Sequence, residues 1–217
     1  MKTKLVIFDM DGVVIDSEKL YYEALRQQAE SMGINNFTRE YYNQFVGGGD
    51  ERMIKILTED YHSADIAHQL IDGCWNRIDD LMAAGELDLK PGYLELNAYL
   101  KDHNIQSILG TSSHFNKAKD MLENVGVFDT FDDFVTADDV ETAKPAPDIF
   151  LQAWKTGGKP DKEAALIIED SKNGIIAANR AGIPVVMVPD VIQPDKELAS
   201  KTKAVCKNLK DVINIIQ

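Results

Sequence analysis

Two kinds of hydrophobic spacing divide the chain. Short apolar runs of β-prone residues, typical of strands buried on both faces of a parallel sheet, occur at residues 5–8 and again in the second half. Between them, residues 17–88 carry apolar positions three and four apart and contain no convincing strand, so they predict helices only. We expect these helices to run from Ser17 to Gly33, after Thr38, after a cap at Asp50, and from about Ser63 to Gly85.

The second half alternates strand and helix patterns. We expect strands at 105–110, 131–137, 165–170, 183–188 and 204–206, and helices at 93–103, 116–125, 147–156, 173–182 and 209–216. Such alternation implies right-handed crossovers and therefore an α/β fold with a doubly wound parallel sheet, a Rossmann-like core. The strand at 5–8 belongs to this sheet. The core is therefore predicted to comprise residues 1–16 and 89–217, with an inserted all-helical domain at 17–88.

Composition and charge exclude several classes of partner. The 217 residues are 44% hydrophobic, as in an ordinary globular protein, and carry a net charge of −13, which repels nucleic acid and anionic membranes. No window approaches the length of a membrane span. Cys74 and Cys206 are too few and too far apart for a disulfide framework. We therefore expect a cytoplasmic protein, and a monomer.

The predicted strands end in reactive side chains. Asp9 and Asp11 follow the first strand, and side chains two apart on an extended backbone share a face. The strand at 165–170 ends in Glu169 and Asp170. Because sites in open parallel sheets lie beyond the carboxyl ends of the strands, these acids should meet there. Asp9 and Asp170, with Glu169 near enough to assist, would make a Mg²⁺ site, since Mg²⁺ prefers oxygen ligands.

Two further segments point to an anion beside this metal. Thr111, Ser112 and Ser113 offer hydroxyl and backbone N–H groups at the start of a helix, a cradle for phosphate. Lys144 would supply positive charge. Each feature also has a plain structural alternative, namely a helix cap for the hydroxyls and acids or a solvated loop for the lysine. These alternatives would have to hold at four strand ends together.

Four segments, taken in order, carry a family resemblance. D-M-D-G-V-V-I-D-S, G-T-S-S, K-P-A-P-D-I-F and I-I-E-D-S resemble the four signatures of the haloacid dehalogenase superfamily, most closely its β-phosphoglucomutase-like phosphatase branch with a helical cap after strand one. The resemblance spans nearly the whole chain. It implies that Asp9 is a nucleophile that becomes aspartyl-phosphate and that Asp11 is the general acid/base. Thr111 would bind the transferring phosphoryl group, with Ser112 and Ser113 beside it.

The same resemblance assigns the charges of the site. Lys144 would neutralise the phosphoryl group together with Asp9. Mg²⁺ would be held by Asp9, the backbone carbonyl of Asp11, and Asp170, with Glu169 as a further ligand.

The resemblance places V-G-G-G-D-E-R-M at the substrate-facing loop of the cap. Gly48, Asp50 and Arg52 are therefore candidate substrate-binding residues. Sugar-phosphate mutases carry an arginine where Asp50 stands, and a histidine expected of them is replaced near Tyr21. Both departures count against a mutase, although Arg52 could substitute for the arginine. The alternative is that this segment only caps a helix.

These observations predict a Mg²⁺-dependent phosphatase acting on a small phosphorylated metabolite, for example a sugar phosphate. Two other enzymes stay open, a β-phosphoglucomutase and an inorganic pyrophosphatase. A catalytically idle protein that binds phosphate esters is the alternative from another class, and the intact set of acids, hydroxyls and lysine argues against it.

Overall fold

The β-prone runs of the sequence form one parallel sheet of six strands in the order β3-β2-β1-β4-β5-β6. The structure, a computed structural model, describes residues 2–47 and 49–216. The strands are β1 (Leu5–Phe8), β2 (Gln106–Gly110), β3 (Asp133–Val135), β4 (Ala165–Glu169), β5 (Val185–Met187) and β6 (Ala204–Val205). This order places β1 at the centre, where the direction of winding reverses. Ligands bind at that point in folds of this kind.

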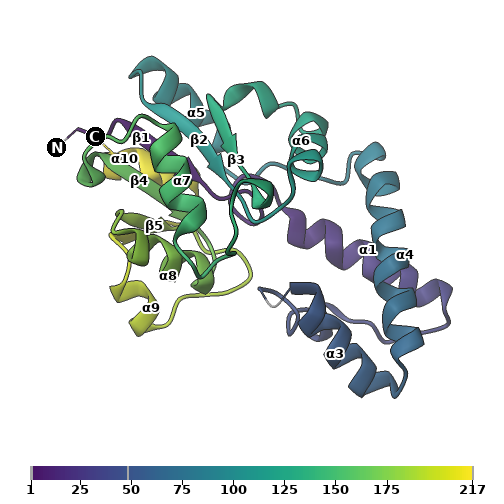
Figure 1. Ribbon diagram of the computed structural model, residues 1–217. Coiled ribbons are helices and arrows are strands. Elements are labelled where there is room, and N and C mark those ends of the chain that lie inside the picture. Colours follow the sequence, from purple (N-terminus) through teal and green to yellow (C-terminus); the bar gives the residue numbers. More distant parts are fainter. Residues whose placement is uncertain (1, 48, 217) are drawn as a thin grey trace. The chain divides into compact units, whose positions relative to one another are not determined.

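Helices cover both faces of the sheet. Leu5 and Ile7 face a cluster formed with α7 (Asp148–Thr156) and α8 (Lys172–Ala181), the two helices seen beside each other in Figure 1. The alternate residue Phe8 faces the other side, where its ring lies 6.0 Å from that of Tyr93 in α5 (Tyr93–Asp102). This strict alternation leaves every side chain of β1 buried, which explains its uninterrupted apolar run.

The described part of the core unit contains three further helices. They are α6 (Phe115–Asn124), α9 (Lys196–Ser200) and α10 (Ile213–Ile216), with 3₁₀ turns at Phe128–Thr130, Ala137–Asp139, Lys162–Ala164 and Leu209–Val212. The prediction of one helix over 209–216 is wrong, because its first half forms a 3₁₀ turn. The helix α9 was not predicted. The doubly wound α/β core itself is confirmed.

The chain divides into two compact units, one comprising the residues up to Asp16 and from Leu89 onward, the other Ser17–Asp88. The second unit consists of α1 (Ser17–Ser31), α2 (Arg39–Tyr42), α3 (Gly49–Tyr61) and α4 (Ala64–Ala83). The hydroxyls of Thr38 and Ser63 cap α2 and α4, which begin where the sequence predicts helices. The prediction that Asp50 stands before the third helix is wrong, because α3 already includes Gly49.

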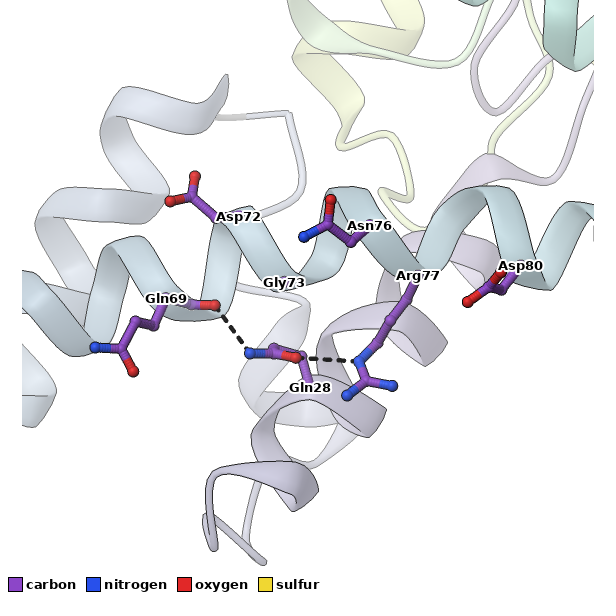
Figure 2. A pocket seen from close by; sticks show the side chains of 7 residues that line it. All are labelled: Gln28, Gln69, Asp72, Gly73, Asn76, Arg77 and Asp80. Carbon is purple, nitrogen blue, oxygen red and sulfur yellow. Dashed lines mark hydrogen bonds between the residues drawn. The ribbon is translucent and has the colours of Figure 1, made fainter.

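Within the helical unit, α1 and α4 pack side by side. Gln28 of α1 lies over Gly73 of α4, donates a hydrogen bond to the Gln69 carbonyl (3.0 Å) and accepts one from Arg77 (3.1 Å). Figure 2 shows these residues along a polar groove that Asp72, Asn76 and Asp80 also line. Among the described residues, no helix combines the length and apolar character needed to span a bilayer.

Candidate active site

Asp9 lies at the carboxyl end of the central strand. Its N–H donates to the Ile168 carbonyl at 3.0 Å, which continues the pairing of β1 with β4 by one residue. Phe8 stands opposite both Leu109 and Ile168, so Asp9 is level with Gly110 and Glu169. The Asp9 residue is 8% exposed. The strand register therefore brings the acids of two strands together, as the sequence predicts.

Gly12 turns the chain away from the site. Its φ of +75° lies in the left-handed region that side-chain-bearing residues avoid. A Cβ at this position would also stand only 2.5 Å from Oδ2 of Asp170. Glycine is therefore required here both for the turn and for the close approach of Asp170.

Lys144 joins the two acidic strand ends. Its Nζ lies 2.5 Å from Oδ1 of Asp9 and 2.9 Å from Oε1 of Glu169. The lysine side chain is 7% exposed, and its ammonium stands over the ring of Phe150 at 4.6 Å. The alternative of a solvated loop lysine is therefore wrong, because this ammonium is buried between two carboxylates.

Glu169 is fully buried and has a partner for each oxygen. Oε1 accepts from Lys144, and Oε2 accepts from the N–H of Ser171 at 2.7 Å. Its side chain folds back over the first turn of α8, where a Cβ on Gly174 would stand 1.6 Å from Oε1. Glu169 is thus held in place by the protein itself.

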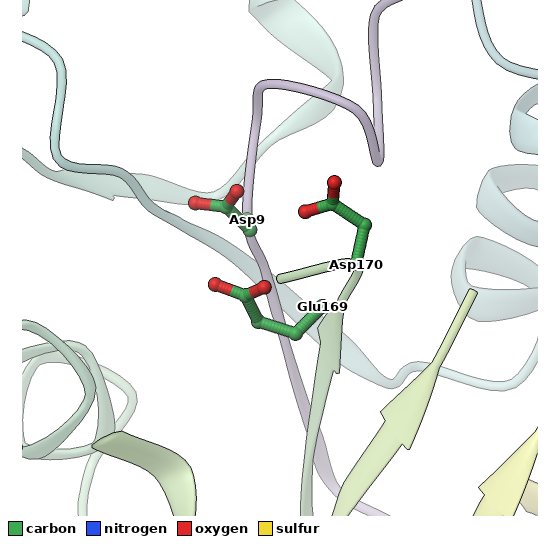
Figure 3. Close-up of side chains that lie close together, drawn as sticks. All are labelled: Asp9, Glu169 and Asp170. Carbon is green, nitrogen blue, oxygen red and sulfur yellow. The ribbon is translucent and has the colours of Figure 1, made fainter. Parts of the chain in front are cut away.

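Asp170 completes a group of three carboxylates. Asp9, Glu169 and Asp170 each offer an oxygen within 4.8 Å of the others. Figure 3 shows Asp9 and Asp170 coming from neighbouring chain segments with Glu169 beneath them. Asp170 receives no hydrogen bond from any residue that the structure describes. It is the acid of this group that is most open to a bound cation.

Burial and neighbouring charges raise the pKa values of three groups in the site. Burial raises the pKa of Asp9 to about 7, and the charge of Glu169 adds to this while Lys144 opposes it. Burial, followed by the charges of Glu169 and Asp9, raises the pKa of Asp170 well above its usual range. Burial lowers the pKa of Lys144, but the charges of Asp9 and Glu169 outweigh it and lift that pKa above its ordinary value.

These shifts show that one ammonium does not balance the buried acids. Hard carboxylate oxygens short of positive charge fit a divalent cation such as Mg²⁺.

The hydroxyl segment lies against Asp11. Ser113 Oγ donates to Oδ2 of Asp11 at 3.1 Å, whereas Oδ1 of Asp11 is buried without a hydrogen-bond partner in the described part of the chain. Thr111 is buried and its Oγ1 accepts from the Ser113 N–H at 3.0 Å. The N–H of Thr111 donates to Val135. The expected N–H cradle is therefore incomplete, because two of the three N–H groups are used inside the protein.

Comparison with known proteins decides the family. Residues 6–188 match the family described as haloacid dehalogenase-like hydrolase. The chain belongs to this family. A phosphorylated carbohydrates phosphatase from Thermotoga maritima is 29% identical over 98% of this chain and 97% of its own length. A (DL)-glycerol-3-phosphatase from Arabidopsis thaliana is 30% identical over 85% of this chain and 79% of its own length.

Solved structures of haloacid dehalogenase-like proteins share the fold. The structure of CbbY from Rhodobacter sphaeroides in complex with phosphate is 25% identical, with a TM-score of 0.76 over 98% of this chain and 96% of that one. The predicted superfamily and enzyme class, a phosphoric monoester hydrolase, are confirmed by the family and by the phosphatases among its relatives.

The cap residues of this haloacid dehalogenase-like hydrolase stay predictions. Gly48 and the side chain of Asp50 lie outside the described residues. Arg52 is exposed on α3 of the helical unit. Its role toward substrate is therefore untested.

One pair near the cluster was not predicted from the sequence. Lys90 Nζ lies 2.7 Å from Oδ1 of Asp190, and both side chains are largely buried. Asp190 lies shortly after the end of β5 at Met187, so the rule of an acid near a strand end could have found it. Nothing in the spacing of the sequence marks Lys90.

Proposed function

We propose that this protein is a Mg²⁺-dependent phosphatase that hydrolyses a small phosphorylated metabolite through an aspartyl-phosphate on Asp9. The observation that carries the proposal is the contact of Lys144 with both Asp9 and Glu169, next to the carboxylate of Asp170, which accepts no hydrogen bond from the described residues. A buried, lysine-paired carboxylate at the end of the central strand is suited to attack phosphorus.

The first step transfers the phosphoryl group to the enzyme. An oxygen of Asp9 attacks phosphorus, the bond from phosphorus to the ester oxygen breaks, and the proton of Asp11 passes to the leaving oxygen. The contacts of Asp11 support this role, since Ser113 Oγ donates to one of its oxygens and the other accepts no hydrogen bond from the described residues. Lys144 neutralises negative charge on the phosphoryl oxygens while it steadies Asp9.

The second step releases phosphate. A water molecule attacks phosphorus and gives its proton to Asp11, and the bond between phosphorus and Asp9 breaks. Asp9 and Asp11 thus return to their starting states, and the protons balance over the two steps. The carboxylates of Asp9 and Asp170, with the backbone carbonyl of Asp11 and with Glu169 alongside, would hold the metal. When bound, Mg²⁺ supplies charge neutralisation for the phosphoryl oxygens.

The relatives favour a phosphorylated sugar or polyol as substrate. Two of them are named for phosphorylated carbohydrates and for glycerol 3-phosphate. The net charge of −13 also favours a small ester over a nucleic acid, since the field of the protein repels polyanions.

A substrate panel tests the proposal. Phosphate release is measured for sugar phosphates, glycerol phosphates, pyrophosphate and nucleotides, with Mg²⁺ and with a chelator. We expect release that requires Mg²⁺ and falls at least about 10⁴-fold in Asp9→Asn. The matched control is Asp102→Asn, at an exposed aspartate of α5, which should turn over normally.

Other outcomes of the substrate panel would support one of the alternative functions. Conversion of β-glucose 1-phosphate to glucose 6-phosphate without phosphate release indicates a mutase. Turnover of pyrophosphate alone indicates a pyrophosphatase, and tight binding without turnover indicates an idle binding protein. Release that is unchanged in Asp9→Asn contradicts the proposed mechanism.

A further inference from the structure

Asp190 and Lys90 form a buried ion pair next to the three carboxylates. Lys90 Nζ and Oδ1 of Asp190 are 2.7 Å apart, and the two side chains are 13% and 12% exposed. The N–H of Val188 donates to the Glu169 carbonyl at 2.9 Å, which places the end of β5 beside the end of β4. Asp190 follows two residues later. The pair is therefore anchored to the same sheet edge as Asp170.

The second oxygen of Asp190 points to the same spot as Asp170. A Cβ on Gly12 would stand 2.5 Å from Oδ2 of Asp170 and 3.2 Å from Oδ2 of Asp190. The Lys90 N–H also donates to the Val14 carbonyl at 2.9 Å, so Lys90 is fixed to the segment that follows Gly12. The two oxygens thus lie on one side of the Gly12 turn, with no side chain between them and glycine.

This Oδ2 of Asp190 has no donor. It is buried and makes no hydrogen bond with any described residue. A buried acceptor without a partner costs about 1–3 kcal/mol, and a buried ion pair alone seldom adds enough stability to offset such a cost. A donor that belongs to a bound ligand would remove this cost. Mg²⁺ keeps several of its waters when proteins bind it, and those waters donate hydrogen bonds to nearby carboxylates.

We infer that Asp190 is a positioning residue of the metal site, in which it accepts hydrogen bonds from the water molecules around the cation while Lys90 fixes its orientation. This inference rests on the proposed function, because it assumes a cation at Asp9 and Asp170. In this arrangement Asp190 contacts the water molecules around the cation and not the cation itself. The Lys90–Asp190 pair then has a role in metal binding besides any role in stability.

Calorimetric titration of the full chain with Mg²⁺, in the absence of substrate, tests the inference. Asp190→Asn should bind Mg²⁺ at least about tenfold more weakly than the wild type, the usual effect of losing such a contact. Asp102→Asn removes the same charge at an exposed site and should bind like the wild type. Equal affinity in Asp190→Asn and the wild type overturns the inference.

A second variant controls for misfolding of Asp190→Asn. It also separates the effect of the position of Asp190 on Mg²⁺ binding from the effect of its charge. Asp190→Asn leaves the Lys90 ammonium buried without its partner, whereas the double variant Lys90→Met/Asp190→Asn removes both charges. The double variant keeps the net charge near the cation unchanged, so weaker Mg²⁺ binding in it supports a positional role. Wild-type affinity in a double variant that melts normally without Mg²⁺ contradicts that role.

The proposed metal site is checked in the same series. Asp170→Asn should abolish Mg²⁺ binding. If it does, and the Asp190 variants bind normally, only the inference about Asp190 fails. If the wild type itself binds no Mg²⁺, the proposed function fails together with the inference.

Discussion

Lys144 is the residue on which the charge balance of the site depends. It is buried between Asp9 and Glu169, which stand 135 and 25 positions away in the sequence. Two carboxylates at this depth repel each other and resist ionisation unless a cation lies between them. The ammonium of Lys144 lies in that position, and its pKa is raised above the ordinary value by the two charges despite its burial.

Removing this ammonium should weaken both the fold and the reaction. Lys144→Met leaves Glu169 buried without compensation, so we expect the free energy of unfolding to fall by about 3 kcal/mol. Phosphate release should fall by about 10²–10³-fold, as when one charge-stabilising donor is lost. Denaturant unfolding without Mg²⁺ and a phosphate assay measure the two effects. Lys101→Met, at an exposed lysine of α5, is the control and should change neither.

At this scale the sequence predicted which acids lie close together but not which groups each of them contacts. Asp9, Glu169 and Asp170 follow from the rule that acids at the ends of parallel strands meet. Their individual partners do not follow from it. Glu169 turns back onto the N–H of Ser171 because Gly174 leaves room, and that detail depends on the packing of α8 against β4. The sequence pattern carries no information about such a turn.

The start of α8 shows how a helix holds a side chain of the site. Gly174 lies in the first turn of this helix, directly over the Glu169 carboxylate. Gly73 of α4 lies under Gln28, whose Oε1 and Nε2 would stand 2.4 and 2.3 Å from an added Cβ. The two glycines differ in what they cover. Glu169 is fully buried and fixed at both oxygens, whereas Gln28 is the half-buried end of a long side chain that can turn outward if it gives up its hydrogen bonds to Gln69 and Arg77.

This difference predicts unequal effects of the same substitution on stability. Gly174→Ala should lower the free energy of unfolding by about 1–3 kcal/mol, because the new methyl group displaces a fixed carboxylate. Gly73→Ala should change stability by no more than about 1 kcal/mol, because the helix preference of alanine offsets the hydrogen bonds to Gln69 and Arg77 that Gln28 loses when it turns outward. Thermal unfolding of both variants checks the pair. A destabilised Gly73→Ala beside a normal Gly174→Ala would contradict this view of Glu169.

Elements with a clear hydrophobic pattern were predictable from the sequence, including the short strands β3, β5 and β6, whereas α9 and the 3₁₀ turn at Leu209–Val212 were not. Apolar runs predicted β1, β2 and β4, because a strand buried on both faces has a continuous apolar sequence. Helical spacing predicted α1 and α4, because a helix buried on one face has apolar positions three and four apart. The five-residue helix α9 is too short to show a period. The 3₁₀ turn at Leu209–Val212 has an apolar pattern that also fits an α-helix, so spacing alone could not separate the two.

The whole molecule carries a net charge of −13, and three of its acidic side chains, those of Asp9, Glu169 and Asp170, lie together at one site. Asp170 is half-buried, has a raised pKa and receives no hydrogen bond from the residues described. Because its pKa is higher in the folded protein than in the unfolded chain, ionisation of Asp170 lowers the stability of the metal-free fold as the pH rises. A bound cation should reverse this effect.

Stability should therefore respond to Mg²⁺ in a way that depends on Asp170. At Mg²⁺ concentrations about one hundred times the dissociation constant, the wild type should gain about 2.7 kcal/mol. Asp170→Asn should melt higher than the wild type in a chelator and gain nothing from Mg²⁺. Thermal melts with and without Mg²⁺ give both results. If Mg²⁺ stabilises Asp170→Asn as strongly as the wild type, the cation binds at a site that does not include Asp170.

The proposed phosphatase mechanism depends most on the chemistry of Asp9. Trapping of the covalent intermediate tests this chemistry directly. The enzyme is mixed with a rapidly hydrolysed phosphoester and Mg²⁺, quenched in acid within one turnover, and its peptides are analysed by mass spectrometry. We predict one phosphoryl group on the peptide that contains Asp9, absent in Asp9→Asn and in chelator. Turnover without a phosphorylated peptide, or with the phosphoryl group on another residue, would contradict the account.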